Sequence, residues 1–235
     1  MLTNTTIDDG VAVVRIDDGK ANAVSTALIG ELHDALDRAL ADAGSVCLVG
    51  RPGRFSAGFD LSVMTAGPDA ARGLVAAGAE LLMRIYGHPQ PTVAAVTGHA
   101  LAAGVLLAAV CDTRIGAADV PAKLGLNEVA IGMHLPAFAL AIANERVLKK
   151  HLVAATVQAT VYDMAGAVDA GWLDALSPGA DLEATAIAEA RRLGGLGRRG
   201  YAKTKTLARG ALIAGVLAEL ADDLASFEVR TPDAG

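Results

Sequence analysis

The sequence predicts an α/β fold: strand–strand–helix units coil over residues 1–180, and a helical region over residues 181–235 completes the same structural domain. Three observations support this prediction. Short β-rich apolar runs alternate with helical patterns in the first half of the chain. The units recur loosely, at intervals of roughly forty to fifty residues. No linker or low-complexity segment divides the chain of 235 residues.

Strands are expected where short apolar runs are bounded by turn residues. The β-rich run 11–16 ends at Asp17-Asp-Gly19, which is typical of a hairpin turn. The run 46–49 precedes the loop Gly50-Arg-Pro-Gly53, and the run 92–96 precedes a turn at Thr97 and Gly98. Residues 113–117 form one further expected strand.

Helices are expected where the apolar residues have helical spacing. Thr26 can cap a helix over residues 26–41, whose leucines at 28, 32, 36 and 40 share one face. The helix expected over residues 68–86 points Leu74, Leu81 and Ile85 inward. Further helices are expected over residues 101–110, 135–147, 149–159, 165–170, 182–193 and 202–227.

Composition and charge exclude some classes of partner. The chain carries a net charge of −6, which argues against nucleic acid as the main partner. The apolar run 92–111 contains His99 and glycines and lacks basic flanks, so a buried strand, turn and helix are expected there, not a membrane span. Basic residues gather between Arg191 and Arg209. They indicate either a solvated helix face or a contact to a small phosphorylated ligand.

The cysteines and the first residues indicate a compartment. Cys47 and Cys111 lie in apolar runs and are expected to be buried free thiols in a reducing compartment. The first ten residues lack the basic and apolar pattern of a signal peptide. A cytoplasmic location is therefore predicted. The histidines show no metal-ligand spacing, so no metal site is expected.

Two segments of small residues are the most informative feature of the chain. They are Phe55-Ser-Ala-Gly-Phe-Asp-Leu61 and Gly98-His-Ala-Leu-Ala-Ala-Gly104. Small side chains before a helix start let a ligand approach the backbone N–H groups closely. Two such segments could aim two amide donors at one oxygen, as the oxyanion of a thioester enolate requires.

With these segments placed, residues 11–207 resemble the crotonase superfamily, the enoyl-CoA hydratase/isomerase family. The resemblance is carried by RFSAGFDL, GHALAAGVLLAAVCDTRIGA and LGLNEVAIGMHLP in this order. It implies a crotonase-type spiral of ββα units, an acyl-CoA thioester as substrate and a role in fatty-acid metabolism. Coenzyme A would be part of the substrate, with no further cofactor. It also implies a homotrimer or a dimer of trimers, with the Phe59 and Ala103 N–H groups as the oxyanion donors.

Glu128 is the candidate proton carrier. It lies in the otherwise apolar run 124–135, where burial would raise its pKa toward neutrality, as a general base requires. The resemblance places a catalytic glutamate at this position. The alternative is a structural glutamate paired with Arg114 or Arg146.

Leu106 decides which reaction is expected. Hydratases of the family carry a second catalytic glutamate at this position, and a leucine can neither hold nor activate water. Gly125-Leu-Asn-Glu128 also resembles the Δ3,Δ2-enoyl-CoA isomerases of the family, which use a single glutamate. An isomerase is therefore favoured. The alternatives are a weak hydratase and a non-catalytic acyl-CoA binding protein.

The resemblance also implies substrate contacts. The turn Lys20-Ala21-Asn22 resembles the segment that contacts coenzyme A, mostly through its backbone. His134 is expected either to pack in the pocket or to act as an acid or base, and Asp60 to cap the following helix. The chain continues only briefly after Phe227, so a shortened last helix and a more open rim are expected. The remaining expected contacts are Ala57, Gly58, Leu61, Gly104 and Leu106.

Overall fold

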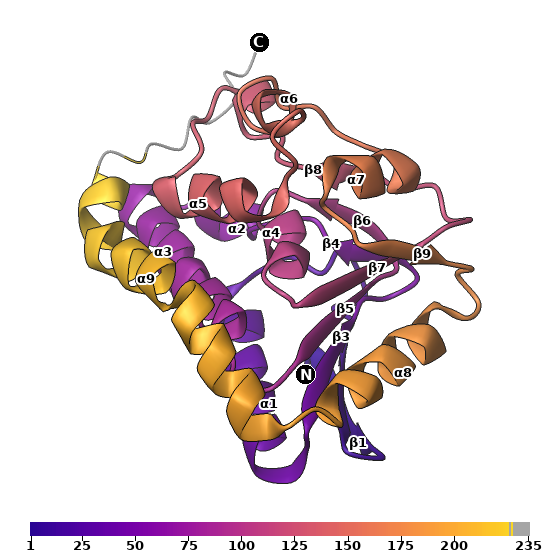
Figure 1. Cartoon of the computed structure of the whole chain (residues 1–235). Coiled ribbons are helices and arrows are strands. Elements are labelled where there is room, and N and C mark those ends of the chain that lie inside the picture. Colours follow the sequence, from indigo (N-terminus) through magenta and orange to yellow (C-terminus); the bar gives the residue numbers. More distant parts are fainter. Residues whose placement is uncertain (226, 228–235) are drawn as a thin grey trace.

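A computed structural model describes residues 1–225 and residue 227 (Figure 1). The main sheet has six strands in the order β1-β2-β3-β5-β7-β9, and a second sheet has three in the order β4-β6-β8. β1 pairs antiparallel with β2, and the other strand pairs within the two sheets are parallel. This arrangement of strands and helices confirms the predicted α/β class.

The elements follow one another along the whole described chain. The strands are β1 Thr3–Asp8, β2 Val11–Ile16, β3 Ser45–Val49, β4 Gly53–Ser56, β5 Thr92–Val96, β6 Gly98–Leu101, β7 Thr113–Ala117, β8 Leu124–Gly125 and β9 Ala175–Ser177. The helices are α1 Thr26–Asp42, α2 Leu61–Met64, α3 Pro68–Tyr86, α4 Ala103–Ala109, the 3₁₀ turn η1 Val129–Ile131, α5 Ala137–Arg146, α6 Leu152–Ala155, α7 Met164–Ala170, α8 Leu182–Gly194 and α9 Arg198–Ala225.

The first hairpin lies earlier in the chain than the sequence predicted. β1 and β2 are joined at Asp9 and Gly10, which have φ angles of 43° and 78°. The prediction of a hairpin turn at residues 17–19 is wrong, because β2 leads there into the segment before α1. β1 was not predicted, because most of its residues are exposed or partly buried and its sequence shows no apolar alternation.

The structure corrects the ends of three predicted helices. Ser25, not Thr26, caps α1, since its side chain accepts from the Leu28 N–H. The helix expected from residue 101 begins at residue 103, because residues 98–101 pair as β6 between β4 and β8. α6 spans only residues 152–155 and is much shorter than the predicted 149–159; after it, Ala159 adopts a left-handed φ of 50° and Tyr162 pairs with Leu124 of β8.

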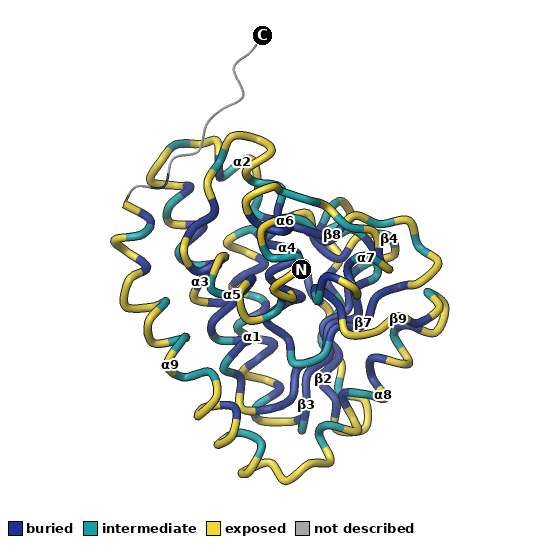
Figure 2. Tube along the Cα trace, turned by 45° about the horizontal axis from the view of Figure 1, so that its top comes forward, coloured by how far each residue is buried: buried dark blue, intermediate teal, exposed yellow. Residues whose placement is uncertain are grey.

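The central strands are buried between helices. α8 packs on β2, β3, β5 and β7, while α1 lies on the other side of these strands (Figure 1). Figure 2 shows the central strands as buried and much of α9 as exposed. The apolar residues 92–111 form β5, β6 and α4 inside this core. Cys47 of β3 and Cys111 after α4 are both buried free thiols. Among the described residues, no helix is long and apolar enough to cross a membrane.

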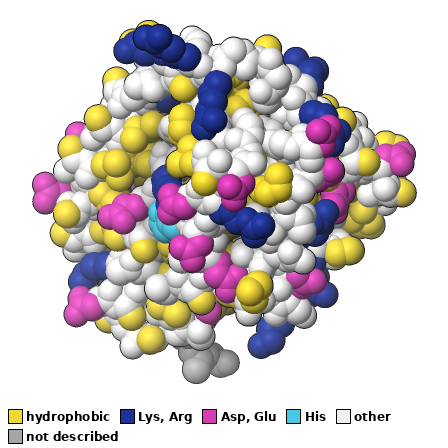
Figure 3. All heavy atoms as spheres, turned by 90° about the horizontal axis from the view of Figure 1, so that it is seen from below, with side chains coloured by type: hydrophobic (Ala, Val, Ile, Leu, Met, Phe, Trp, Pro, Cys, Tyr) yellow, Lys and Arg dark blue, Asp and Glu magenta, His cyan; other side chains and the backbone are white. Residues whose placement is uncertain are grey.

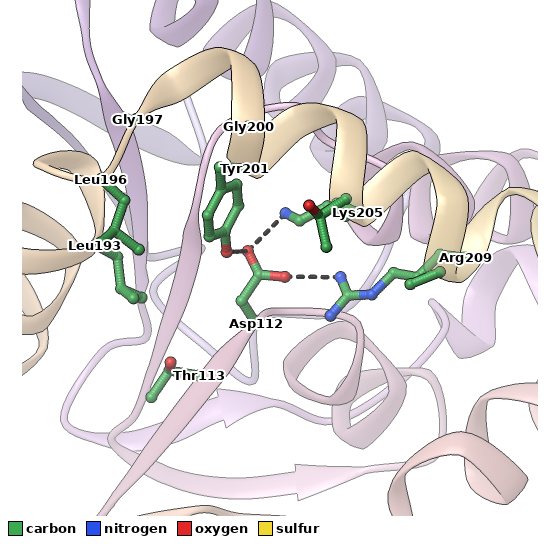
Figure 4. Close-up of a pocket in the computed structure, with 11 residues that line it drawn as sticks. Asp112, Thr113, Leu193, Leu196, Gly197, Gly200, Tyr201, Lys205 and Arg209 are labelled. Carbon is green, nitrogen blue, oxygen red and sulfur yellow. Dashed lines mark hydrogen bonds and ion pairs between the residues drawn. The ribbon is translucent and has the colours of Figure 1, made fainter.

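α9 is anchored to the core by a buried ionic cluster around Asp112 (Figure 4). The Asp112 carboxylate accepts from Lys205 Nζ at 2.6 Å, from Arg209 Nη1 at 2.7 Å and from the Tyr201 hydroxyl at 2.8 Å. Burial alone would raise the pKa of Asp112, but these two cations and the Thr92 N–H outweigh it and hold the pKa below its ordinary value. A surface hollow of about 540 Å³ lies beside the cluster.

The basic residues of the two C-terminal helices fall into two groups, one in the Asp112 cluster and one on the surface. Lys205 is buried in the Asp112 cluster, which corrects the expectation of a solvated face at this position. Arg191 pairs with Asp8 and Asp9 on the surface, and Arg192 pairs with Glu189. Figure 3 shows acidic and basic side chains interspersed on the face seen from below.

Candidate active site

A cavity of about 200 Å³ lies where α2, α4, η1 and α5 meet, and it contains the candidate catalytic groups. Its wall is almost entirely apolar. Asn127 and Glu128 contribute the two polar side chains among the described residues that line it. An apolar pocket with a few convergent polar groups is typical of a small-molecule site.

The first candidate donor is held by the loop after β4. Val24 pairs with Phe59 as an isolated bridge: Val24 N–H donates to the Gly58 carbonyl at 2.8 Å, and Asp60 N–H donates to the Val24 carbonyl at 3.1 Å. In the described part of the chain, the Phe59 N–H between them has no protein acceptor. The Phe59 residue lines the cavity, so this N–H group is available to a ligand.

The second candidate donor begins α4. Ala103 is the first residue of this helix, so its N–H has no acceptor inside the helix and finds none elsewhere among the described residues. Ala102 before it is tied to β8 by its N–H, which donates to the Gly125 carbonyl at 3.0 Å. Both alanines line the cavity.

Two glycines bring the donor segments together. A Cβ atom on Gly58 would lie 2.9 Å from the Ala102 Cβ and 3.5 Å from the Ala103 nitrogen. A Cβ atom on Gly104 would lie 2.2 Å from the Ser56 carbonyl oxygen. Only glycine allows this approach of the two backbones, so the same residues that pack tightly also bring the two donors to one cavity.

Ala102 occupies a strained backbone conformation, with φ 51° and ψ −128°. Such a conformation costs about 1–3 kcal/mol in a residue other than glycine. Ala102→Gly is expected to raise the free energy of unfolding by about 1 kcal/mol, because relief of strain exceeds the added freedom of the unfolded chain. Urea denaturation measures this change. Ala108→Gly in α4 is the matched control and is expected to lower the free energy of unfolding. An equal loss of stability in both variants would show that the backbone of Ala102 is not strained.

Glu128 is partly buried, and its carboxyl group has no charged partner among the described residues. Its Oε2 atom is buried and has no hydrogen-bond partner, and burial raises its pKa to about 7. The predicted alternative of an ion pair is wrong. Arg114 pairs with Asp174, and Arg146 donates to the carbonyls of Ala109 and Cys111.

The raised pKa makes stability depend on pH. The pKa of Glu128 rises from 4.5 to about 7 on folding. Below pH 4.5 the carboxyl is protonated in both states, so its ionisation does not change the free energy of unfolding. As pH rises from 4.5 to about 7, the free energy of unfolding falls, because the unfolded chain ionises first. We expect Glu128→Gln to be more stable than the unmodified chain at pH 8, by on the order of 3 kcal/mol, and equally stable at pH 4. Urea denaturation at both pH values tests this. Equal stability at pH 8 would show that the carboxylate is well solvated.

No second carboxylate lines the cavity among the described residues. Leu106, one turn into α4, is buried and forms part of the apolar wall. Within residues 1–225 and 227, no group of three or more His, Cys, Asp or Glu residues could hold a metal ion. The site therefore presents one titratable carboxyl and two main-chain donors.

A family model matches most of the chain. Residues 6–222 match the model of a family described as enoyl-CoA hydratase/isomerase. The chain belongs to the enoyl-CoA hydratase/isomerase family. The predicted resemblance to the crotonase superfamily is thus confirmed.

Solved structures of this family share the fold. An enoyl-CoA hydratase/isomerase family protein from Pseudomonas syringae has a TM-score of 0.93 at 36% identity, covering 97% of this chain and 98% of that one. Human mitochondrial Δ3-Δ2-enoyl-CoA isomerase has a TM-score of 0.91 at 27% identity, covering 97% and 90%. These likenesses confirm the crotonase-type fold with its C-terminal helical region.

A relative from Bacillus subtilis is named for a different activity. The protein named probable enoyl-CoA hydratase from Bacillus subtilis is 40% identical over 137 residues, which are 57% of this chain. The match spans only 52% of the Bacillus protein, about half its length. Hydratases and isomerases of the family are therefore both among the relatives.

The structure gathers about half of the predicted site residues around the cavity. Those that line it are Ala57, Phe59, Leu61, Ala103, Leu106 and Glu128. Gly58 and Gly104 are buried and do not line the cavity, and Asp60 caps α2 through the Ser62 N–H, as predicted.

The turn 20–22 does not line the cavity. Asn22 is fully buried, and its side-chain amide donates to the carbonyls of Ile16, Arg54 and Phe55. The Asn22 side chain is therefore occupied within the protein, and the contact of this turn with coenzyme A through its backbone stays a prediction. Lys20 is exposed and Ala21 is partly exposed.

His134 and the end of the chain correct two further expectations. His134 is exposed outside the cavity, where its ring meets the Phe227 ring edge-on at 5.4 Å. Phe227 is buried and lines the cavity, so the rim is closed there rather than open. The residues after Phe227 lie outside the described part of the chain.

Several wall residues were missed. Asn127 carried a signal, because it is the polar neighbour of Glu128 in an apolar run. Phe138 and Phe227 carried none, because only the packing of α5 and α9 brings them to the cavity. Met64 and Met133 were not missed: the sequence indicated pocket wall or core for both, and both line the cavity.

Proposed function

We propose that this chain isomerises a 3-enoyl-CoA to a 2-enoyl-CoA, with Glu128 as the single proton carrier. The proposal rests on the chemical groups that line the cavity. One carboxyl with a pKa near 7 shares it with two unpaired main-chain N–H groups, and leucine stands at the position of a second glutamate.

The proposed reaction follows from these groups. The Glu128 carboxylate takes a proton from C2 of the substrate, and the electron pair moves onto the thioester oxygen to give a dienolate. The N–H groups of Phe59 and Ala103 stabilise that oxygen; losing one such donor typically costs about 3–4 kcal/mol. The Glu128 carboxylic acid then returns the proton to C4, leaving the double bond between C2 and C3.

The raised pKa suits both halves of this reaction. A base with a pKa near the working pH is ionised often enough to accept a proton and acidic enough to return it. Coenzyme A enters as part of the substrate, and no other cofactor is proposed. The apolar wall would exclude water from the dienolate.

Hydration is the second candidate, because the Bacillus relative is named a probable hydratase. Hydration requires a water held between two carboxyl groups, and Leu106 supplies no second carboxyl. A hydratase working with Glu128 alone would be slower by about 10²–10⁴-fold than a two-carboxylate site.

A panel of 2- and 3-enoyl-CoA thioesters in oxygen-18 water separates the candidates. Isomerisation gives a 2-enoyl-CoA from a 3-enoyl-CoA without label, whereas hydration places the label in a 3-hydroxyacyl-CoA. Binding of the thioesters without either product would overturn the enzymatic proposal and support an acyl-CoA binding protein.

We also propose that the chain assembles as a trimer or a dimer of trimers. Apolar side chains are exposed around α6, at Leu148, Val153, Val157 and Val161, and a subunit contact would cover them. Light scattering after size exclusion should then give three or six times the chain mass of 23.7 kDa.

A further inference from the structure

The acyl cavity is small. Its volume is about 200 Å³, below the roughly 300–1,000 Å³ of most small-molecule sites. A cavity of about 150 Å³ holds benzene, so this one holds a chain of roughly six to eight carbons. Acyl groups longer than this must either leave the cavity or be excluded.

Phe227 forms the outer wall of this cavity. Phe227 lines the cavity and is only 4% exposed. Its ring also meets the exposed imidazole of His134 edge-on, with the ring centroids 5.4 Å apart. Phe227 therefore contacts both the cavity and a surface side chain.

Contacts at both halves of α9, the helix before Phe227, fix the position of this wall residue. The Asp112 cluster anchors the first half of the helix (Figure 4). Near its end, the Asp223 carboxylate accepts from the Ala137 N–H of α5 at 2.8 Å, and Leu224 is buried. The Phe227 N–H then donates to the Leu224 carbonyl at 3.1 Å. α5 supplies the neighbouring wall, so the two walls are tied together.

We infer that Phe227 is a specificity-determining residue that limits the acyl chain to about eight carbons. This inference rests on the proposed acyl-CoA function. A longer chain would collide with the ring, whereas removing the ring would open the cavity toward the surface beside His134 and let the chain pass out. One methylene in a hydrophobic pocket already changes kcat/KM by about 10–200-fold, so a collision of several methylenes is easily measured.

The test compares 3-hexenoyl-CoA with 3-dodecenoyl-CoA for the unmodified chain and for Phe227→Ala. We expect the unmodified chain to favour hexenoyl-CoA by about tenfold or more in kcat/KM. In Phe227→Ala the dodecenoyl-to-hexenoyl ratio should rise at least tenfold, with Phe227→Leu in between. A ratio that stays within twofold of the unmodified chain would overturn the inference, as would equal use of both substrates by the unmodified chain.

Leu217→Ala is the matched control, because Leu217 is an exposed leucine on α9, the helix that precedes Phe227. It should leave the ratio unchanged. Calorimetric affinities for saturated hexanoyl-CoA and dodecanoyl-CoA provide a second readout that needs no turnover. If no variant turns over any enoyl-CoA but the affinity ratio shifts in Phe227→Ala, the proposed reaction fails and the role of Phe227 stands. An unchanged affinity ratio would refute the role of Phe227 whatever the turnover.

Discussion

Replacing Glu128 by glutamine is expected to lower the turnover of a 3-enoyl-CoA by about 10²–10⁴-fold, because no other titratable side chain lines the cavity among the described residues. Glutamine keeps the size of the side chain but cannot take the proton from C2. Binding should persist, since the Phe59 and Ala103 N–H groups are untouched. A coupled spectrophotometric assay for the 2-enoyl-CoA product measures the loss.

The pH dependence sharpens this expectation. Because the carboxylate is the active form, kcat/KM of the unmodified chain should rise with pH and reach half its plateau near pH 7, where the pKa of Glu128 lies. Glu219→Gln is the control, since Glu219 is exposed on α9 and should leave the rate and the pH profile unchanged. Turnover retained by Glu128→Gln would remove Glu128 from the mechanism.

Replacing Lys205 by methionine is expected to lower the free energy of unfolding by about 3–5 kcal/mol. Lys205 Nζ contacts Asp112 at 2.6 Å and donates to the carbonyls of His88 at 2.8 Å and Gln90 at 3.0 Å. Methionine fills a similar space but leaves the buried Asp112 charge and both carbonyls without this donor. In a chain of this size the midpoint of thermal unfolding should fall by roughly 6–20 °C.

Lys203→Met is the matched control for this prediction. Lys203 is exposed on α9, two residues before Lys205, and its replacement should change stability by no more than about 0.5 kcal/mol. Urea denaturation of both variants measures the difference. Equal losses in the two would mean that the Asp112 cluster contributes little to the attachment of α9.

Much of the fold could be predicted because its signals are local. The strand at residues 92–96 and the helix at residues 68–86 fall at the predicted bounds, since short apolar runs and helical spacing depend on neighbouring residues. β1 could not be predicted this way. Its pairing with β2 stabilises a strand whose own side chains are mostly polar.

Some residues of the candidate site could likewise be predicted from local motifs, whereas others depend on contacts between distant parts of the chain. Phe59, Ala103 and Glu128 were predicted from three motifs, and they line one cavity. The role of the Asn22 side chain could not be predicted, because its amide donates to the Phe55 carbonyl, 33 positions away. The ion pair of Asp112 with Lys205 could not be predicted from neighbouring residues, because Lys205 lies 93 positions later.

The sequence by itself determined the family, the fold class, the candidate donors and base, and the replacement of a second carboxylate by Leu106. These depend on which residue types occur in which order. Only the tertiary structure decided that Glu128 has no ion-pair partner, that Phe227 closes the cavity and that Lys205 is buried. The physical reason is that desolvation and packing depend on every neighbour in space, and those neighbours come from distant parts of the chain.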